Sequence, residues 1–316
     1  MAPAHAPVTF LRERPILVLA VLLAALVGCI AVIRPGTVTT DWIANSLLFA
    51  APLGLMAGGE TLLLLTGGID LSVASIATAS AYLLAANATH GTAAAVLLAL
   101  APGLLVGLVN GLGVGVFGVQ PLVMTLGTGL MTEGVLVVYS QNIIGATPHV
   151  PDAIVTLGSG KLPGGVPVDL LLWLAVALLL ILGLRRSGFG RLLYAVGDNA
   201  AACRLAGVRV WHVLLAAYVA CGLLAAGAGI VLLGITNAAD LSLANVYLLP
   251  AIAAAIIGGT SIFGGRGGYG GTIVGALFLT VLDSLLTLLD VPEPVRQILY
   301  GTIILLLAAA YTRLTD

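Results

Sequence analysis

The sequence predicts an all-α polytopic membrane protein that crosses a bilayer about ten times, with both termini on the cytoplasmic side. Three observations support this fold class. The 316 residues are 60% hydrophobic and only 8% charged, whereas soluble domains carry about 25% charged residues. Apolar runs of membrane-spanning length recur along the chain. Basic residues gather in alternate connections between these runs, as the positive-inside rule requires.

Ten apolar runs come close to the length of about 20 residues that a membrane-spanning helix needs. The first run follows Arg12 and Arg14 and resembles a signal peptide. It is longer than a signal h-region and ends in Arg34-Pro35-Gly36, so we interpret it as a retained span. The predicted spans are residues 15–33, 43–66, 71–88, 91–117, 122–141, 168–184, 211–234, 247–263, 272–290 and 295–312.

Ten alternating spans with the N-terminus inside divide the twelve basic residues nine to three. The cytoplasmic segments then hold Arg12, Arg14, Arg185, Arg186, Arg191, Arg204, Arg209, Arg266 and Arg313, and the outer segments hold Arg34, Lys161 and Arg296. Since a missed or extra span would scramble this asymmetry, it supports both the even count and the orientation.

Several classes of function are excluded by composition. The three cysteines are far apart and the four histidines are scattered, so we expect neither a disulfide framework nor a metal site. A net charge of −1 gives no sign of a nucleic-acid partner. No catalytic constellation is present, and residues 1–316 are predicted to form a single transmembrane domain.

One side of the fourth span carries a stripe of glycines, which favours close helix packing or a subunit interface. They are Gly103, Gly107, Gly111 and Gly115.

The longest cytoplasmic connection, residues 185–211, separates this chain from a generic helix bundle. Asp198 or Asn199 is a suitable N-cap, three alanines follow, and Gly207 supplies a stop signal. We therefore expect a short helix at Asn199–Ala206 outside the membrane, able to transmit force from a docked protein. The alternative is a basic anchor loop with an incidental amphipathic helix.

This connection resembles the coupling segment of bacterial ABC-importer permeases of the ribose/xylose/galactose branch. The matching residues are Phe189-Gly190-Arg191, Leu193-Tyr194-Ala195-Val196-Gly197, Asn199, Ala202 and Leu205-Ala206-Gly207-Val208. Further stretches match in order: Thr66-Gly67-Gly68-Ile69-Asp70-Leu71-Ser72, Asn110-Gly111, Pro121 with Thr125-Leu126-Gly127-Thr128, Ile257-Gly258-Gly259-Thr260-Ser261, and Gly264-Gly265-Arg266-Gly267.

The resemblance implies a permease subunit similar to the vitamin B12-type, or type II, importer, in a bacterial inner membrane. It implies three protein partners: an ABC ATPase subunit, an extracytoplasmic substrate-binding protein, and a second permease subunit, identical or different. The residues expected to couple to the ATPase are Asn199, Ala202, Arg204, Leu205 and Gly207. Arg204 would pair with an acidic residue there or cap its own helix. The chain lacks a P-loop, and its only lysine is Lys161. We thus expect no cofactor and no enzymatic activity in this chain, with ATP and Mg²⁺ used by the partner.

Polar residues inside the spans are candidates for the translocation path, because such residues usually face a bundle interior or a wet cavity. The candidates are Glu60, Asp70, Ser72, Asn110, Glu133 and Asp283. For each acid the alternative is a hydrogen bond to a neighbouring helix, and for Asp70 it is helix capping. Two Gly-Gly turns, Gly67-Gly68 and Gly264-Gly265, also hint at an internal repeat.

The predicted cargo is a monosaccharide, since carboxylates suit sugar hydroxyls. The same machinery would also serve a nucleoside, a furanosyl signalling molecule or a branched-chain amino acid, and a stand-alone secondary transporter is an alternative of a different class. One stretch departs from the family pattern: Leu248-Leu249-Pro250 stands where acidic residues are common, which leaves the substrate open.

Overall fold

The computed structural model describes residues 15–142 and 149–315, and this part of the chain is helical, without a β-strand. Arg12 and Arg14, two of the basic residues that indicated the orientation, lie outside the described residues. The long helices are α2 (Pro15–Ile33), α3 (Thr40–Leu64), α5 (Thr92–Gly115), α6 (Pro121–Asn142), α8 (Val168–Arg186), α9 (Gly188–Leu205), α10 (Val210–Thr236), α12 (Tyr269–Leu288) and α13 (Glu293–Thr315). The shorter ones are α4 (Val73–Ala86), η1 (Ala88–His90), α7 (Asp152–Ser159), η2 (Asn245–Tyr247) and α11 (Leu248–Ile257).

Every predicted span coincides with a helix, although the boundaries move by several residues. Among the described residues, 7 helices are long and apolar enough to cross a membrane, and α4 and α11 are apolar but shorter. Helix α7 was not predicted from the sequence and lies in the connection between the fifth and sixth predicted spans. The all-helical, multi-pass fold class is therefore confirmed at this coarser level.

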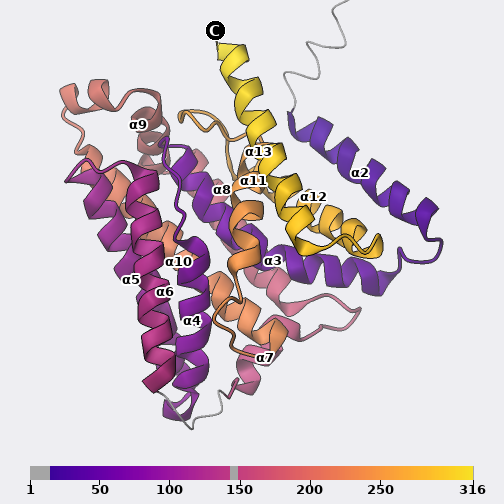
Figure 1. Cartoon of the computed structure of the whole chain (residues 1–316). Helices are drawn as coiled ribbons and strands as arrows, with labels where there is room; N and C mark the ends of the chain where they lie inside the picture. The colour runs from indigo at the N-terminus through magenta and orange to yellow at the C-terminus, as the bar shows by residue number, and fades with distance from the viewer. Residues whose placement is uncertain (1–14, 143–148, 316) are drawn as a thin grey trace, which may run out of the picture.

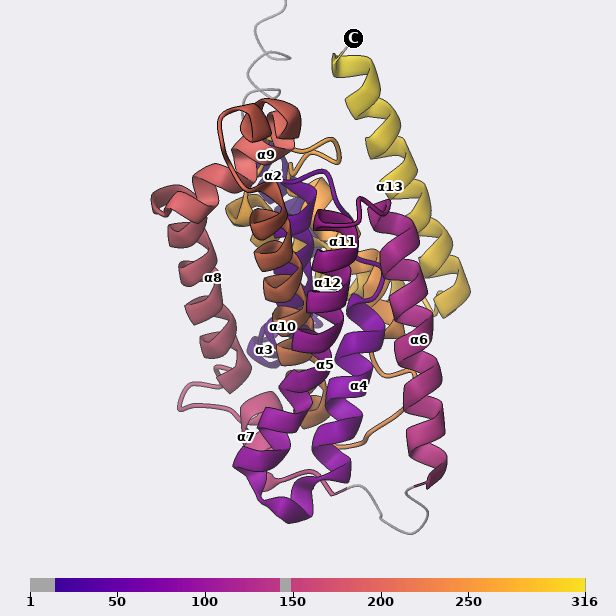
Figure 2. The same ribbon diagram turned by 90° about the vertical axis from the view of Figure 1, so that its left-hand side faces the viewer.

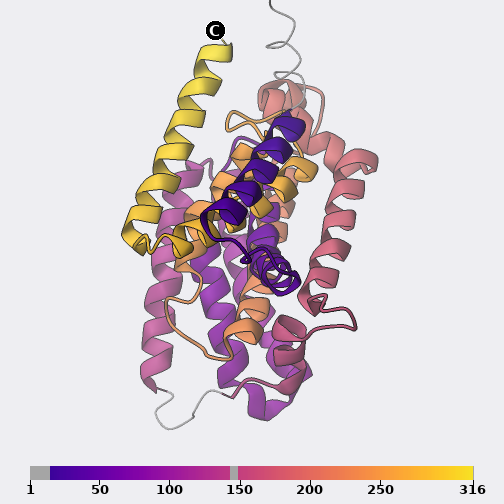
Figure 3. The same cartoon turned by 90° about the vertical axis from the view of Figure 1, so that its right-hand side faces the viewer.

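Two long helices form the centre of the bundle. Helix α3 is buried along almost its whole length, and α10 packs against α3, α4, α5 and α7. The glycine stripe of α5 faces α10: side chains at Gly103, Gly107 or Gly111 would collide with the α10 backbone at Gly222, Tyr218 and Leu215. The stripe thus serves tight packing within the chain rather than a subunit interface. Figure 3 shows α2 lying obliquely over α12, with α8 and α13 at opposite edges.

Helices α4 and α11 are half-length helices that begin in the interior (Figures 1 and 2). The chain leaves α3 at the end that carries α9, descends through residues 65–72, and starts α4, which runs toward α7. After α10 it climbs back from the α7 end through residues 237–247 and starts α11, which runs toward α9. Ala244 donates its backbone N–H to Thr78 Oγ1 at 3.2 Å, so the two starts are adjacent.

The connection between residues 185 and 211 is more helical than predicted. We expected only the short helix at Asn199–Ala206, but α8 extends to Arg186 and α9 already begins at Gly188. Asn199 has extended dihedrals (φ −155°, ψ 93°), which divide α9 into a longer first part and a short second part. The predicted short helix is present as that second part. The additional helix was missed because its glycines and arginine suggested a loop.

Candidate functional site

The candidate site is a cavity of about 320 Å³ between the starts of the two half-length helices. Its lining comes from four places: Leu71, Ala74 and Ser75 from the start of α4, Asn245, Val246, Leu248, Leu249 and Pro250 from η2 and α11, Glu133 from α6, and Gln297 from α13. We call it the central cavity. The first turn of a helix leaves backbone N–H groups without intrahelical partners, and α4 starts beside this space. At α11 the N–H of Leu248 is already bonded to Asn245 O and Pro250 has no N–H.

The polar groups of the central cavity suit a neutral, hydroxylated ligand. Glu133 supplies a carboxylate acceptor, Ser75 supplies a hydroxyl, and Asn245 and Gln297 supply amides that donate and accept. No lysine, arginine or histidine is among the lining residues, so an anionic ligand would lack a positive partner. The stretch Leu248-Leu249-Pro250, which departs from the family pattern, forms part of the apolar wall.

Behind this cavity lies a buried polar cluster that fixes the start of α4. Ser72 donates its backbone N–H (2.8 Å) and its hydroxyl to Asp70 Oδ1. Asn110 donates to Ser72 Oγ at 3.0 Å and accepts from Thr128 at 2.7 Å. Thr125 Oγ1 accepts the N–H of Leu71 at 3.0 Å. All of these side chains are buried, so three of the predicted path residues, Asp70, Ser72 and Asn110, are brought together but do not line the cavity.

Glu60 joins the same cluster from α3. Its Oε2 accepts the Asp70 backbone N–H at 3.4 Å, and the side chain is 0% exposed. Glu60 Oε1, Asp70 Oδ2 and the Tyr218 hydroxyl are buried and have no hydrogen-bond partner within the described residues. The expectation that Asp70 caps α4 directly is wrong in detail, because Ser72 occupies the N-cap position and Asp70 supports it from two residues earlier.

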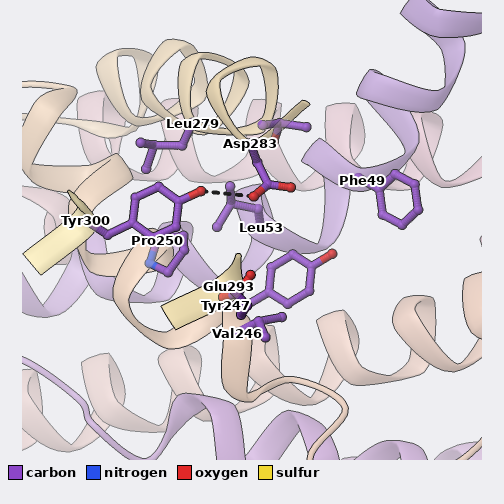
Figure 4. Close-up of a pocket in the computed structure, with 10 residues that line it drawn as sticks. Phe49, Leu53, Val246, Tyr247, Pro250, Leu279, Asp283, Glu293 and Tyr300 are labelled. Atoms are coloured by element: carbon purple, nitrogen blue, oxygen red, sulfur yellow. Dashed lines mark hydrogen bonds between the residues drawn. The ribbon is translucent and has the colours of Figure 1, made fainter. Parts of the chain in front are cut away.

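Asp283 lies at a second cavity of about 240 Å³, next to the first. Val246 and Pro250 line both cavities, and Figure 4 shows Asp283 and Tyr300 facing each other beside Tyr247 and Glu293. Tyr300 donates to Asp283 Oδ1 at 3.2 Å, and Arg296 Nη1 lies 2.9 Å from the same oxygen. The sequence suggested no basic neighbour for this acid, because Arg296 was assigned to an outer segment beyond the span of Asp283.

The short second part of α9 is capped at both ends. Asn199 Oδ1 accepts the backbone N–H of Ala202 at 2.9 Å, which is the N-cap contact predicted from the sequence. At the other end Gly207 (φ +83°) donates to Arg204 O and Val208 donates to Cys203 O, the two bonds of a Schellman motif. Leu205 is 91% exposed, and Arg204 is exposed without an ion pair among the described residues.

The base of this capped helix is fastened to the bundle at Gly197. A side chain there would collide with the Leu65 carbonyl at the end of α3 and with the Gly265 nitrogen. Gly265 itself donates to Leu65 O at 3.0 Å, and Tyr194 donates to Gly267 O at 2.9 Å. The helix is therefore in backbone contact with α3 and with the glycine-rich turn after α11.

Sequence reasoning missed several lining residues, namely Ser75, Asn245, Gln297 and Tyr300. Neutral polar side chains are common in helices, so their type carried no signal. Their proximity depends on where α4, α11 and α13 begin, which composition does not reveal. Of the six predicted path residues, Glu133 and Asp283 line these two cavities, and the other four line neither.

Comparisons with a family model and with individual proteins agree on one family of transport permeases. The family described as "Branched-chain amino acid transport system / permease component" matches residues 42–308. The ribose import permease protein RbsC of Escherichia coli strain K12 is 35% identical over 289 residues, covering 90% of this chain and 89% of the relative. RbsC of Bacillus subtilis is 33% identical, covering 89% and 88% of the two chains. The galactofuranose transporter permease protein YtfT of Escherichia coli strain K12 is 34% identical, covering 81% and 75%. No solved structure matches the fold.

Proposed function

We propose that this chain is the membrane permease of an ATP-driven, binding-protein-dependent importer. The premise is its family: the chain belongs to the branched-chain amino acid transport permease family. Its cargo in this proposal is a monosaccharide, as the printed names of its ribose and galactofuranose relatives suggest. The chain is a multi-pass membrane protein, and we place it in the bacterial plasma membrane with about ten spans of the type II arrangement.

The capped helix at Asn199–Ala206 carries the coupling proposal. It projects from one end of the bundle, exposes Leu205 and Arg204, and is fastened through Gly197 to the end of α3. Arg185, Arg186, Arg191, Arg209 and Arg266 belong to the segments at the same end, which supports a cytoplasmic location. In this proposal an ABC ATPase subunit docks on residues 185–211 and uses ATP and Mg²⁺, and no hydrolysis occurs in this chain.

The central cavity supports the choice of a sugar. Glu133, Asn245, Gln297 and Ser75 offer acceptors and donors without a positive charge, which fits the hydroxyls of a neutral sugar. The binding protein would deliver the sugar at the α7 end. The cavity lies along α6 and α13, and α6 exposes much of its surface. In this proposal a second permease subunit packs against this side.

Reconstitution tests the proposal directly. The permease, its ATPase and its binding protein are placed in liposomes, and ATP-dependent uptake of radiolabelled ribose and galactofuranose is measured. We expect uptake of a monosaccharide that requires all three proteins. Uptake without the ATPase would instead establish a secondary transporter, and a binding protein without sugar affinity would exclude the monosaccharide.

The coupling role has its own test. Replacing Asn199–Gly207 by a flexible linker, or Leu205→Asp alone, should abolish substrate-stimulated ATP hydrolysis while membrane insertion remains intact. Leu223→Asn, a partly exposed leucine of α10 remote from the coupling segment, serves as a control for polar substitution. Normal stimulation in the linker variant would refute the coupling role.

A further inference from the structure

The tripeptide Asp-Leu-Ser occurs twice, each time between a long helix and a half-length helix. Asp70-Leu71-Ser72 joins α3 to α4, and Asp240-Leu241-Ser242 joins α10 to η2 and α11. In both turns the serine donates its backbone N–H and its hydroxyl to Oδ1 of the aspartate, with N–H distances of 2.8 Å and 2.7 Å. The same three residues therefore build the same local structure.

The packing around the two turns also repeats. Helix α4 packs against α5, α6 and α10, and α11 packs against α12, α13 and α3. Helix α5 lies on α10 as α12 lies on α3. The segments α3–α6 and α10–α13 are thus two copies of one four-helix arrangement, and they are inverted, because α4 and α11 run toward opposite ends of the molecule (Figures 1 and 2). This relation replaces the repeat suggested by the two Gly-Gly turns, since the counterpart of the turn after α3 is the one after α10.

The two copies differ in what holds the turn. In the first copy Asn110 of α5 bonds Ser72 and Thr125 of α6 bonds Leu71, and both Asp70 and Ser72 are 0% exposed. In the second copy Asp240 and Ser242 are exposed, and no described side chain of α12 or α13 bonds them.

The residues that would hold the second turn are present. Pro121 lies at the start of α6, and Asn110 precedes it by eleven residues. Pro294 likewise lies at the start of α13, and Asp283 precedes it by eleven residues. Asn110 accepts a hydrogen bond from Thr128, as Asp283 accepts one from Tyr300. Asp283 and Tyr300 face the cavity of about 240 Å³ in Figure 4, which Val246 and Tyr247 also line shortly after the second turn.

We propose that the turn Asp240-Leu241-Ser242 is a mobile seal of the transport path, and that Asp283 and Tyr300 form the site on which it closes. The Ser242 hydroxyl then donates to Asp283, which takes the place that Asn110 has beside Ser72 in the first copy, where Asn110 is the donor. Arg296, 2.9 Å from Asp283 Oδ1, attracts the Asp240 carboxylate. The structure accordingly shows the chain with its first turn sealed and its second turn open. This inference rests on the proposed transport function.

State-dependent cross-linking tests the seal. The pair Ser242→Cys and Tyr300→Cys is introduced into a chain whose Cys29, Cys203 and Cys221 are replaced by alanine, and the assembled transporter is oxidised with copper phenanthroline. We expect the disulfide yield to differ at least about fivefold between the nucleotide-free and the vanadate-trapped transporter, because the populations of the two states differ. The disulfide should block transport, and reduction should restore it. The control pair Ser242→Cys and Asp152→Cys does not join the turn to the proposed closing site. Its disulfide yield should therefore be the same in both nucleotide states.

Two results would overturn the seal: equal yields in both nucleotide states, including no cross-link in either, or a cross-linked transporter that imports at the normal rate. The yield reports conformation without any sugar present. A parent transporter that imports no monosaccharide would therefore refute the proposed cargo, whereas the nucleotide response of the pair would still decide the seal.

Discussion

At the scale of single residues, Glu133 is the acid that lines the central cavity. A carboxylate that hydrogen-bonds a sugar hydroxyl contributes about 1.5–3 kcal/mol. Glu133→Gln should therefore raise the apparent KM for sugar uptake roughly 10- to 100-fold, and ATPase docking should remain unchanged. Asp290→Asn, at an exposed acid with φ +54° that asparagine tolerates, is the matched control. An unchanged KM in Glu133→Gln would remove this residue from the path.

Asn110 is buried and lines neither of the two cavities, so we predict a structural role for it. It links Ser72 before α4 to Thr128 of α6 and is fully buried. Asn110→Ala removes both hydrogen bonds, each worth about 0.5–1.5 kcal/mol, and should destabilise the protein by about 1–3 kcal/mol. Thermal unfolding in detergent measures this effect. The exposed Asn45→Ala on α3 should leave the midpoint nearly unchanged, and equal shifts in the two variants would contradict the assigned role.

At the scale of elements, the junction between α9 and α3 depends on one missing side chain. Alanine is favoured over glycine in a helix by about 0.5–1 kcal/mol, yet at Gly197 its methyl group would collide with the Leu65 carbonyl. Gly197→Ala should displace the capped helix from α3 and reduce sugar-stimulated ATP hydrolysis several-fold more than basal hydrolysis. Gly188→Ala, in the same helix with no atom nearer than 3.9 Å to the added carbon, is the control. Normal stimulation in Gly197→Ala would show that force does not pass through this junction.

The capped helix and the half-length helices differ in how far the sequence predicted them. Asn199 and Gly207 are local signals, because an N-cap side chain and a positive φ act within one turn, and both were recognised. The early start of α9 was missed although Ser187 caps it by accepting the N–H of Gly190, because the glycines there suggested a loop. The short α7 was missed because no side chain caps it. The interior starts of α4 and α11 were also missed, because their apolar composition continues past the helix ends.

At the scale of the whole molecule, one surface of the chain is rich in exposed apolar side chains. Helix α6 exposes Leu130, Met131 and Val135 beside Glu133, and the central cavity lies along this helix. The proposed second permease chain would cover this side and keep Glu133 away from lipid, where a carboxylate is costly. Native mass spectrometry of the purified transporter should find two permease chains together with the ATPase subunits. A particle with one permease chain would contradict this arrangement.

The sequence by itself determined the membrane class, the family and the capped helix at Asn199–Ala206. These depend on composition, on short motifs and on contacts within a single turn, which residue identity specifies directly. Only the tertiary structure decided which polar residues line a cavity and which are buried behind it. Asp70 and Glu133 are both acids within predicted spans, yet one is fixed by Ser72 behind α4 and the other faces open space. The relation of the two Asp-Leu-Ser turns also required the fold, because their equivalence lies in the packing of helices distant in sequence.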